Sequence, residues 1–360
     1  MADNGTFKTQ GIKYAGSKLK ILPYIMQMVG SLNQVKNVLD GFSGTTRVSQ
    51  ALAQSGYRVT ANDLSDWSEV LGNCYLKATK PDVFYQEILD ELNSLQGYNG
   101  WFTAHYANPD ELEKMPFQRK NLRKVDAIRD HIENLNLGWE DKCVILTSLM
   151  LALDKVDNTL GHFSSYLSEW SARSYQQLNL QLPMRFELKD EHEVCREDVM
   201  TLTKERTFDL VYFDPPYGSN NQKMPSSRVR YQSYYHFWTT LIKHDSPELF
   251  GKVNRRADSR DGKAVTIFEE YKRNNENRYI ALDALRKLIE QTNAHYIMLS
   301  YSSGGKATKE ELHDILSSSG KLLQVMEIDY RKNIMSQMRW TNEWINSDGK
   351  YREYLFLMEK

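Results

Sequence analysis

The sequence of 360 residues is poor in cysteine, and its three cysteines, Cys74, Cys143 and Cys195, lie far apart without a CxxC pair. We therefore expect neither a disulfide framework nor a bound metal, and a reducing compartment fits this cysteine usage. The sequence also has no apolar run long enough to span a bilayer, and its first ten residues lack the apolar core of a signal peptide. These absences predict a cytoplasmic protein without a membrane partner.

Charge of one sign is not in excess either, since Lys and Arg total 46, Asp and Glu total 47, and the formal net charge is −1. A nucleic-acid-binding protein with this balance must gather its positive charge on one face. Apolar residues make up 41% of the chain, which is enough for a sizeable core. The length predicts two domains, or one large domain that carries an insertion.

The spacing of apolar residues predicts an α/β fold. A strand at 37–40 is followed by a glycine turn, an amphipathic helix over 45–55 and a second strand at 57–61, which together form a βαβ unit. After residue 190 the alternation resumes, with strands predicted at 208–213, 294–300, 321–328 and 351–358 and helices at 281–291 and 309–316. Such alternation is typical of a Rossmann-like, doubly wound sheet that is largely parallel.

Residues 73–189 follow a different pattern, in which helical periodicity is interrupted by glycine and proline and aromatic residues are frequent. We interpret them as an inserted, mostly helical domain, which divides the α/β domain into two parts, residues 1–72 and 190–360. Within the second part, residues 218–263 are predicted to form a long basic loop. Seven basic residues stand against two acids between Gly218 and Arg256.

The tetrapeptide Asp214-Pro215-Pro216-Tyr217 follows a short apolar run and has the strongest chemical implication in the chain. Its two prolines fix the backbone at the place where a strand of an open α/β sheet opens a ligand crevice. The acid can accept a hydrogen bond from an amine, and the ring can stack on a base. This combination suits transfer of a methyl group to the exocyclic amine of a planar heterocycle. The plainer alternative is a strand-end turn without chemistry.

Three further motifs lie upstream of this tetrapeptide. The turn Asp40-Gly41-Phe42-Ser43-Gly44 has small residues that let a ligand approach the backbone at a helix N-terminus, although a structural turn is about equally consistent. Asp63 ends the second strand, where an acid usually binds a ribose diol; the alternative is a helix N-cap. The segment 13–18 places a glycine between an aromatic ring and a lysine, which suits covering a ligand.

In this order and context, the four motifs resemble those of the Dam-like (alpha-group) N6-adenine DNA methyltransferases, over residues 8–72 and 190–360. The resemblance implies a Rossmann-like methyltransferase sheet, with the helical insertion as target-recognition domain and S-adenosylmethionine as the cofactor. It implies that the cofactor contacts Tyr14, Lys18, Asp40, Phe42, Gly44, Asp63, Asp198 and Asp214. It also implies that the catalytic loop consists of Asp214, Pro215, Pro216 and Tyr217.

The reaction implied by the resemblance needs a positioned amine. The adenine amino group is a poor nucleophile because its lone pair is delocalised into the ring. Asp214 and the Pro215 carbonyl can accept its two N–H bonds, which favours a more tetrahedral nitrogen with its lone pair aimed at the methyl donor. Pro216 fixes the turn. A base inside a duplex cannot reach such a pocket, so it must be flipped out, and Tyr217 would stack on it.

Several other activities compete with this interpretation. An N4-cytosine DNA methyltransferase shares the mechanism but more often has Ser in place of Asp214, and RNA or protein-glutamine methyltransferases more often have Asn. A catalytically inactive DNA-binding relative predicts a damaged loop, and the loop here is intact. A nucleotide-dependent phosphotransferase lacks support because there is no GxxxxGK[ST] loop. We predict a site-specific adenine methyltransferase of double-stranded DNA, from a restriction–modification system with a separate cognate endonuclease or from a phage.

Positive charge for the DNA phosphates is predicted in two places, the basic loop and the helical segment 118–124 of the insertion. For the segment 118–124, a solvated helix face is equally consistent. The aromatic residues around 235–241 are better explained as a core helix than as contacts to the base. The residues expected to contact DNA are Arg119, Lys120, Arg123, Arg228, Arg230, Arg255 and Arg256.

Overall fold

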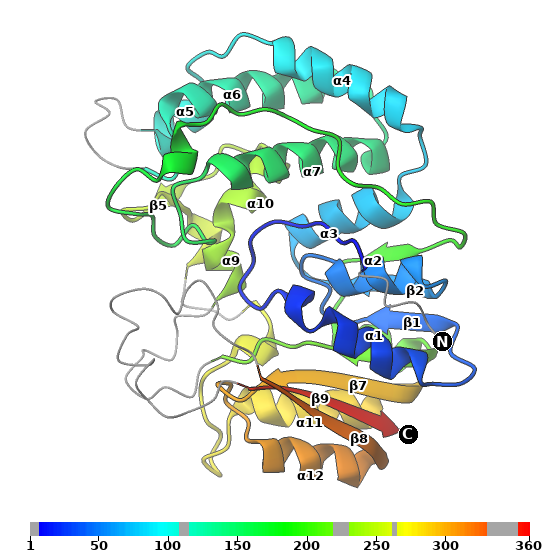
Figure 1. Ribbon diagram of the computed structural model, residues 1–360. Helices are drawn as coiled ribbons and strands as arrows, with labels where there is room; N and C mark the ends of the chain where they lie inside the picture. Colours follow the sequence, from blue (N-terminus) through cyan, green and yellow to red (C-terminus); the bar gives the residue numbers. More distant parts are fainter. Residues whose placement is uncertain (1–6, 108–114, 219–229, 261–264, 330–351) are drawn as a thin grey trace.

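The computed structural model describes residues 7–107, 115–218, 230–260, 265–329 and 352–360. Its main feature is a seven-stranded sheet in the lower half of Figure 1. In spatial order, the strands are β3 (Glu193–Cys195), β2 (Arg58–Asn62), β1 (Asn37–Asp40), β4 (Phe208–Phe213), β7 (Ala294–Ser302), β9 (Arg352–Glu359) and β8 (Lys321–Asp329). The first five are parallel, and β9 is antiparallel to both of its neighbours. The predicted doubly wound, largely parallel sheet is confirmed, whereas β3 and the reversal of β9 were not predicted.

Helices cover both faces of this sheet. Along β4, Leu210 and Tyr212 pack into one buried cluster, whereas Val211 and Phe213 pack into the other, as expected for side chains that alternate between faces. The helices of the first face are α1 (Leu22–Gly30), preceded by η1 (Lys18–Lys20), and α2 (Arg47–Gln54). Those of the second face are α8 (Val199–Glu205), α11 (Ile280–Gln291) and α12 (Lys309–Ser319).

The strand order reverses between β1 and β4, because β1, β2 and β3 progress toward one edge and β4 and β7 toward the other. In open α/β sheets, ligands bind beyond the carboxyl ends of the strands at such a switch point. Gly41 follows β1 and Asp214 follows β4, and the Gly41 N–H donates to the Tyr212 carbonyl oxygen over 2.9 Å. The glycine turn and the Asp-Pro-Pro-Tyr loop therefore meet at the switch point.

The second half of the molecule is helical and lies in the upper part of Figure 1. Its elements are α3 (Asp66–Gly72), η2 (Asn73–Lys77), α4 (Asp82–Ser94), α5 (Trp101–Tyr106), α6 (Arg119–Asn134), α7 (Trp139–Val156) and η3 (Ala172–Tyr175). Their buried cluster includes Trp67 of α3 and also contains Phe237, Trp238 and Leu241 of α10 (His236–Lys243). The helices of the insertion share this core with α3 and α10, which lie outside the predicted limits of 73 and 189. These domain limits stay a prediction.

The segment between β4 and α11 joins the two halves. It comprises α9 (Tyr231–Tyr234), α10 (His236–Lys243), the hairpin β5 (Leu249–Phe250) and β6 (Arg255–Arg256), η4 (Ala257–Ser259) and η5 (Ile267–Glu269). Figure 1 shows α10 among the helices of the upper half, although it follows a strand of the sheet in the chain. Tyr235, Phe237 and Trp238 are buried, in agreement with the interpretation of the residues around 235–241 as a core helix. Over the described ranges, no helix has the length and apolar character needed to cross a bilayer.

Candidate active site

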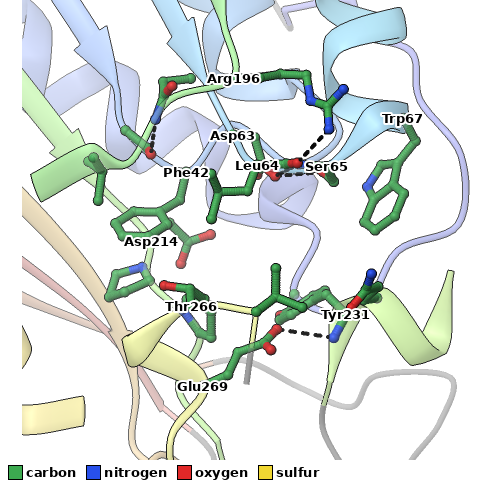
Figure 2. A pocket seen from close by; sticks show the side chains of 18 of the residues that line it. Phe42, Asp63, Leu64, Ser65, Trp67, Arg196, Asp214, Tyr231, Thr266 and Glu269 are labelled. Carbon is green, nitrogen blue, oxygen red and sulfur yellow. Dashed lines mark hydrogen bonds between the residues drawn. The ribbon is translucent and has the colours of Figure 1, made fainter. Parts of the chain in front are cut away.

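A cavity of about 270 Å³ lies at the switch point, between the sheet and the helical half. Figure 2 shows Phe42, Asp63 and Leu64 above it, Thr266 and Glu269 below it, and Asp214 at one side. Of the residues expected at the cofactor, those that line the cavity are Tyr14, Lys18, Phe42, Asp63, Asp198 and Asp214. Pro215, Pro216 and Tyr217 line it as well, so the predicted catalytic loop and most of the predicted cofactor residues converge on one cavity.

The Asp214 carboxylate is held at both oxygens. The Lys18 ammonium lies 2.9 Å from Oδ2, and the Tyr217 hydroxyl donates to Oδ1. The same hydroxyl reaches Oε1 of Glu353 on β9 at 2.6 Å. Burial, together with the nearby Glu353 charge, raises the pKa of Asp214 to about 6, although Lys18 opposes this shift. At neutral pH the group is therefore a carboxylate that can still accept a hydrogen bond.

Two tyrosines from the segment after β4 hold the N-terminal motif, residues 13–18, in place. The Tyr14 ring packs against both Tyr231 and Tyr235, at centroid distances of 5.2 and 4.9 Å. The Ala15 N–H donates to the Tyr235 hydroxyl over 2.7 Å, and the Tyr231 hydroxyl donates to the Ala15 carbonyl over 3.3 Å. Gly16 has φ +89°, a conformation that glycine adopts without strain. The turn that carries Lys18 is thus built against the helical half.

The glycine turn after β1 meets the acid that ends β2. The Gly44 N–H donates to Oδ2 of Asp63 over 2.9 Å. Gly44 has φ +49°, and a Cβ there would lie 3.1 Å from the Tyr14 ring, so a side chain would be both strained and crowded. Phe42 packs edge-on against Phe213 and Phe268. Gly44 therefore shapes the cavity from behind, without lining it.

Asp40 does not face the cavity, contrary to the expectation that it contacts a cofactor. It is 1% exposed, and its Oδ2 accepts a hydrogen bond from the Ser49 hydroxyl over 2.6 Å. Burial raises the pKa of Asp40 to about 7. Because the side chain bonds to Ser49 of α2, Asp40 connects the end of β1 to the helix that follows the glycine turn.

The two acids expected at the ribose and adenine of a cofactor both make local hydrogen bonds. Oδ1 of Asp63 accepts from the Ser65 N–H over 2.9 Å and from the Ser65 hydroxyl over 2.5 Å. Asp198 caps α8 by accepting the Met200 N–H over 2.8 Å. Asp63 is not the N-cap of α3, which is Ser65, but its bonds to Ser65 order the turn before that helix, and contact with a ribose diol stays a prediction.

Sequence reasoning missed two polar groups of the cavity wall. Oε1 of Glu269 accepts the Tyr231 N–H over 3.1 Å, while its Oε2 is buried with no partner among the described residues. Burial raises the pKa of Glu269 to about 7. The indole N–H of Trp67 is likewise buried without a partner in the described part of the chain. Neither residue belongs to a motif, so no local signal marked them.

The predicted DNA contacts of the insertion lie at the start of α6. Lys120 and Arg123 are exposed, and Arg119 is partly exposed. The Lys120 ammonium donates to the Tyr175 carbonyl over 2.6 Å, and Arg123 donates to the Gly97 carbonyl over 3.2 Å. Both side chains stay at the surface despite these bonds. Their contact with phosphates stays a prediction.

The basic loop differs from its prediction. Arg256 is 3% exposed and makes two bonds of 2.7 Å to the Asp245 carboxylate, with a further 2.8 Å contact to Asp258. Arg230 is 4% exposed. The prediction that Arg230 and Arg256 contact phosphates is therefore wrong, because both side chains are buried. Arg255 is partly buried and donates to the Ser259 carbonyl over 2.7 Å.

Arg228 lies outside the described residues. Among the described residues, no group of three or more His, Cys, Asp or Glu side chains is arranged to hold a metal ion.

The sequence model of the D12 class N6 adenine-specific DNA methyltransferases matches residues 14–334. This chain belongs to that family. The methyltransferase is 27% identical over 363 residues to the type II methyltransferase M.NlaIII of Neisseria lactamica, covering 97% of this chain and 99% of that protein. It is 29% identical to the modification methylase StsI of Streptococcus sanguinis, with 97% of this chain but only 52% of that protein covered. The solved [4+2]-cyclase SpnF overlaps with it at a TM-score of 0.36 and 8% identity, over 97% of this chain and 86% of that one.

The family confirms the Dam-like resemblance and makes the protein an adenine-specific DNA methyltransferase. Because this family is adenine-specific and acts on DNA, the match excludes the N4-cytosine, RNA, protein and phosphotransferase alternatives. The substrate of the methyltransferase is DNA, and its relatives carry the names of type II and modification methylases.

Proposed function

We propose that the cavity binds S-adenosylmethionine and a flipped-out adenine side by side. The cofactor would be held by Phe42, Asp63 and Asp198, at the ends of β1, β2 and β3, and the base by the Asp214–Tyr217 loop. The observation that carries the proposal is that both sets of residues open into one cavity at the switch point. The cofactor supplies an electrophilic methyl group bound to a sulfonium.

The charge of the cavity wall suits a cationic cofactor. Six residues of the wall carry carboxyl groups, and three carry cationic groups. The cations face carboxylates of the same region: Lys18 faces Asp214, and Arg196 and Lys243 face Asp66. The surplus of acid favours a ligand with a positive centre, and burial of Asp214 and Glu269 strengthens that preference when they are ionised.

Catalysis would rest on orientation of the adenine amine. Asp214 is held rigidly by Lys18 and Tyr217, so its remaining lone pairs can accept one N–H of the amine, and the Pro215 carbonyl can accept the other. Both bonds favour a pyramidal nitrogen whose lone pair faces the methyl donor, and a fixed acceptor needs no reorganisation in the transition state. Tyr217 lines the cavity and offers an aromatic contact for the base.

On the DNA side, we propose that the helical half carries the target-recognition surface and that the cations of α6 contact phosphates. The target would be double-stranded DNA, with the base flipped into the cavity. The names of the relatives support a role in restriction–modification, in which a separate endonuclease cleaves unmodified sites.

The proposal is tested by transfer of labelled methyl from S-adenosylmethionine to duplex DNA, followed by analysis of the modified base. The wild-type protein should yield N6-methyladenine. Asp214→Ala should lower transfer by at least about 10³-fold, because it removes a preorganised acceptor, and should leave cofactor affinity within about threefold, since ground-state binding rests on other residues. Thr308→Ala, which removes the N-cap of the remote helix α12, serves as control. Full activity in Asp214→Ala would overturn the proposed role of Asp214.

A further inference from the structure

Glu353 is a buried acid next to the catalytic loop that no motif predicted. It lies on β9, is 6% exposed, and follows the last residue of the family match at 334. The register of the sheet pairs Glu353 with Ser302 of β7 and Ile328 of β8. A buried acid costs free energy unless it is compensated, so the contacts of Glu353 indicate what it does there.

The contacts of Glu353 all lead toward Asp214. Its Oε1 accepts the Ser300 hydroxyl over 2.9 Å, lies 2.6 Å from the Tyr217 hydroxyl, which can donate its one proton to Glu353 or to Asp214, and lies 3.4 Å from the Lys18 ammonium. Tyr217 and Lys18 are the same two groups that hold the Asp214 oxygens. Glu353 therefore closes a ring of four side chains that come from η1, the catalytic loop and β9.

Each member of this ring constrains another. Lys18 is 7% exposed, and two carboxylates fix its position between them. The Tyr217 hydroxyl lies within hydrogen-bond reach of both the Asp214 and the Glu353 carboxylate and can donate its one proton to either of them, which restricts rotation of the ring that faces the cavity. Without Glu353, Lys18 and Tyr217 would each lose one of the partners that set their direction.

We propose that Glu353 is a positioning residue for methyl transfer, which holds Lys18 and Tyr217 so that together they orient the Asp214 carboxylate toward the substrate amine. This inference rests on the catalytic role proposed for Asp214. Glu353 itself lies behind the loop and does not line the cavity, so its effect is on kcat more than on binding.

The charge of Glu353 has a second consequence. It raises the pKa of Asp214, because two ionised carboxylates close to one Lys18 repel each other. Other titratable groups that face Asp214 are Lys18 and Tyr217, Asp40 and Tyr212 from β1 and β4, and Tyr14 and Tyr231 from the segments above. Removing only the Glu353 charge should therefore lower the pKa of Asp214, and activity that needs the carboxylate should persist to lower pH.

The test compares Glu353→Gln and Glu353→Asp with the wild-type enzyme in steady-state kinetics at about pH 5 to 8, a window that brackets the shifted Asp214 pKa. In Glu353→Gln, kcat should fall about tenfold, KM should stay within about threefold, and the acid limb should move down by about 0.5 pH unit or more. Glu353→Asp keeps the charge but shortens the reach, so kcat should fall while the limb stays. Glu359→Gln removes an acid from the same strand at the surface and serves as control.

Wild-type kcat and an unmoved acid limb in Glu353→Gln would overturn the inference. A loss of kcat that equals the loss of folded protein, with the limb unmoved, would also overturn it, since that is a structural effect. If Glu353→Gln does not fold, Glu353→Asp decides, and wild-type kcat there rejects a positioning role. Activity in Asp214→Ala would instead reject the proposed function, so the two failures are distinguishable.

Discussion

The sheet half and the helical half of the methyltransferase bury charge in different ways. Around the Asp-Pro-Pro-Tyr loop, burial raises the pKa values of the acids Asp214 and Asp40 to about 6 and about 7, with Lys18 as a buried cation beside Asp214. The helical half buries acids too, such as Asp126 and Asp157, but two of its buried ionisable groups are arginines, which stay charged at all relevant pH values. Arg129 on α6 is fully buried and donates to the Leu241 carbonyl over 2.7 Å, while Arg256 is locked by two carboxylates.

This difference teaches what buried charge does in each half. Acids whose pKa lies near neutrality can exchange protons and partners, which is useful beside a reacting amine. An arginine with several hydrogen bonds instead joins elements: Arg129 ties α6 to the end of α10, and Arg256 ties the hairpin to the loop after α10. We therefore expect charge changes at the buried acids beside the Asp-Pro-Pro-Tyr loop to alter activity and its pH dependence, and changes at the buried arginines of the helical half to alter stability.

The largest effect is expected at Arg129. Arg129→Met keeps an apolar stem of similar length but leaves the Leu241 carbonyl, which Arg129 contacts, without its donor inside the protein. The free energy of unfolding should fall by about 2–4 kcal/mol, since buried acceptors that lose a charged partner are costly. Chemical denaturation measures the change, and the exposed Arg123→Met on the same helix serves as control. A loss equal to that of the control would break the comparison between the halves.

A smaller loss of stability is expected for Arg256→Gln. The variant keeps part of the hydrogen bonding but leaves Asp245 and Asp258 without their cation, at a cost of about 1–3 kcal/mol. Because Arg256 is turned inward, the slope of DNA affinity against salt concentration should not change. Denaturation and titrations of DNA binding at several salt concentrations test both statements. A slope that flattens by about one unit would return Arg256 to the DNA contacts.

The cations at the start of α6 lie at the surface, so their replacement is the counterpart of the Arg256 experiment. Replacement of Arg119, Lys120 and Arg123 by Gln should reduce the salt slope by about 0.9 for each phosphate that the variant no longer neutralises, with little change in stability. The same DNA titrations measure it. An unchanged slope would mean that these charges form a solvated face, the alternative that the sequence left open.

The activity of the enzyme should depend on pH because Asp214, in the sheet half, titrates near neutrality. As the pH falls through about 6, Asp214 becomes protonated, so it loses the negative charge that accepts the amine N–H. The kcat/KM for the cofactor should then fall about tenfold for each further pH unit. Initial rates with circular dichroism at each pH distinguish this loss from acid unfolding. A rate that stays flat to pH 5 would show that the ionised carboxylate is not required.

The smallest effect is expected where the halves join. Tyr235→Phe removes the hydroxyl that accepts the Ala15 N–H, while the ring still stacks on Tyr14. The free energy of unfolding should fall by about 1 kcal/mol, and cofactor affinity should fall a few-fold because the Lys18 turn is less well held. Calorimetric titration measures the affinity. An unaltered affinity would mean that the turn holds its position without the helical half.

Much of the sheet half was predictable because its signals are local. The run 208–213 is apolar on both faces and coincides with β4, and the Asp-Pro-Pro-Tyr loop follows it in the chain. The four motifs converge because the carboxyl ends of parallel strands share one edge. By contrast, Glu353 stands 136 residues from Tyr217 and enters the site only through β9, whose reversed direction was not predicted.

The sequence alone determined the kind of sheet, the position of the Asp-Pro-Pro-Tyr loop and the family, since strand periodicity and short motifs are encoded by neighbouring residues. The tertiary structure decided which charges serve chemistry and which serve packing. Arg256 and Arg123 look alike in the sequence, but one pairs inside the protein and the other faces solvent. Burial and pairing depend on residues distant in the chain, and these surroundings set both the pKa of an acid and the availability of an arginine.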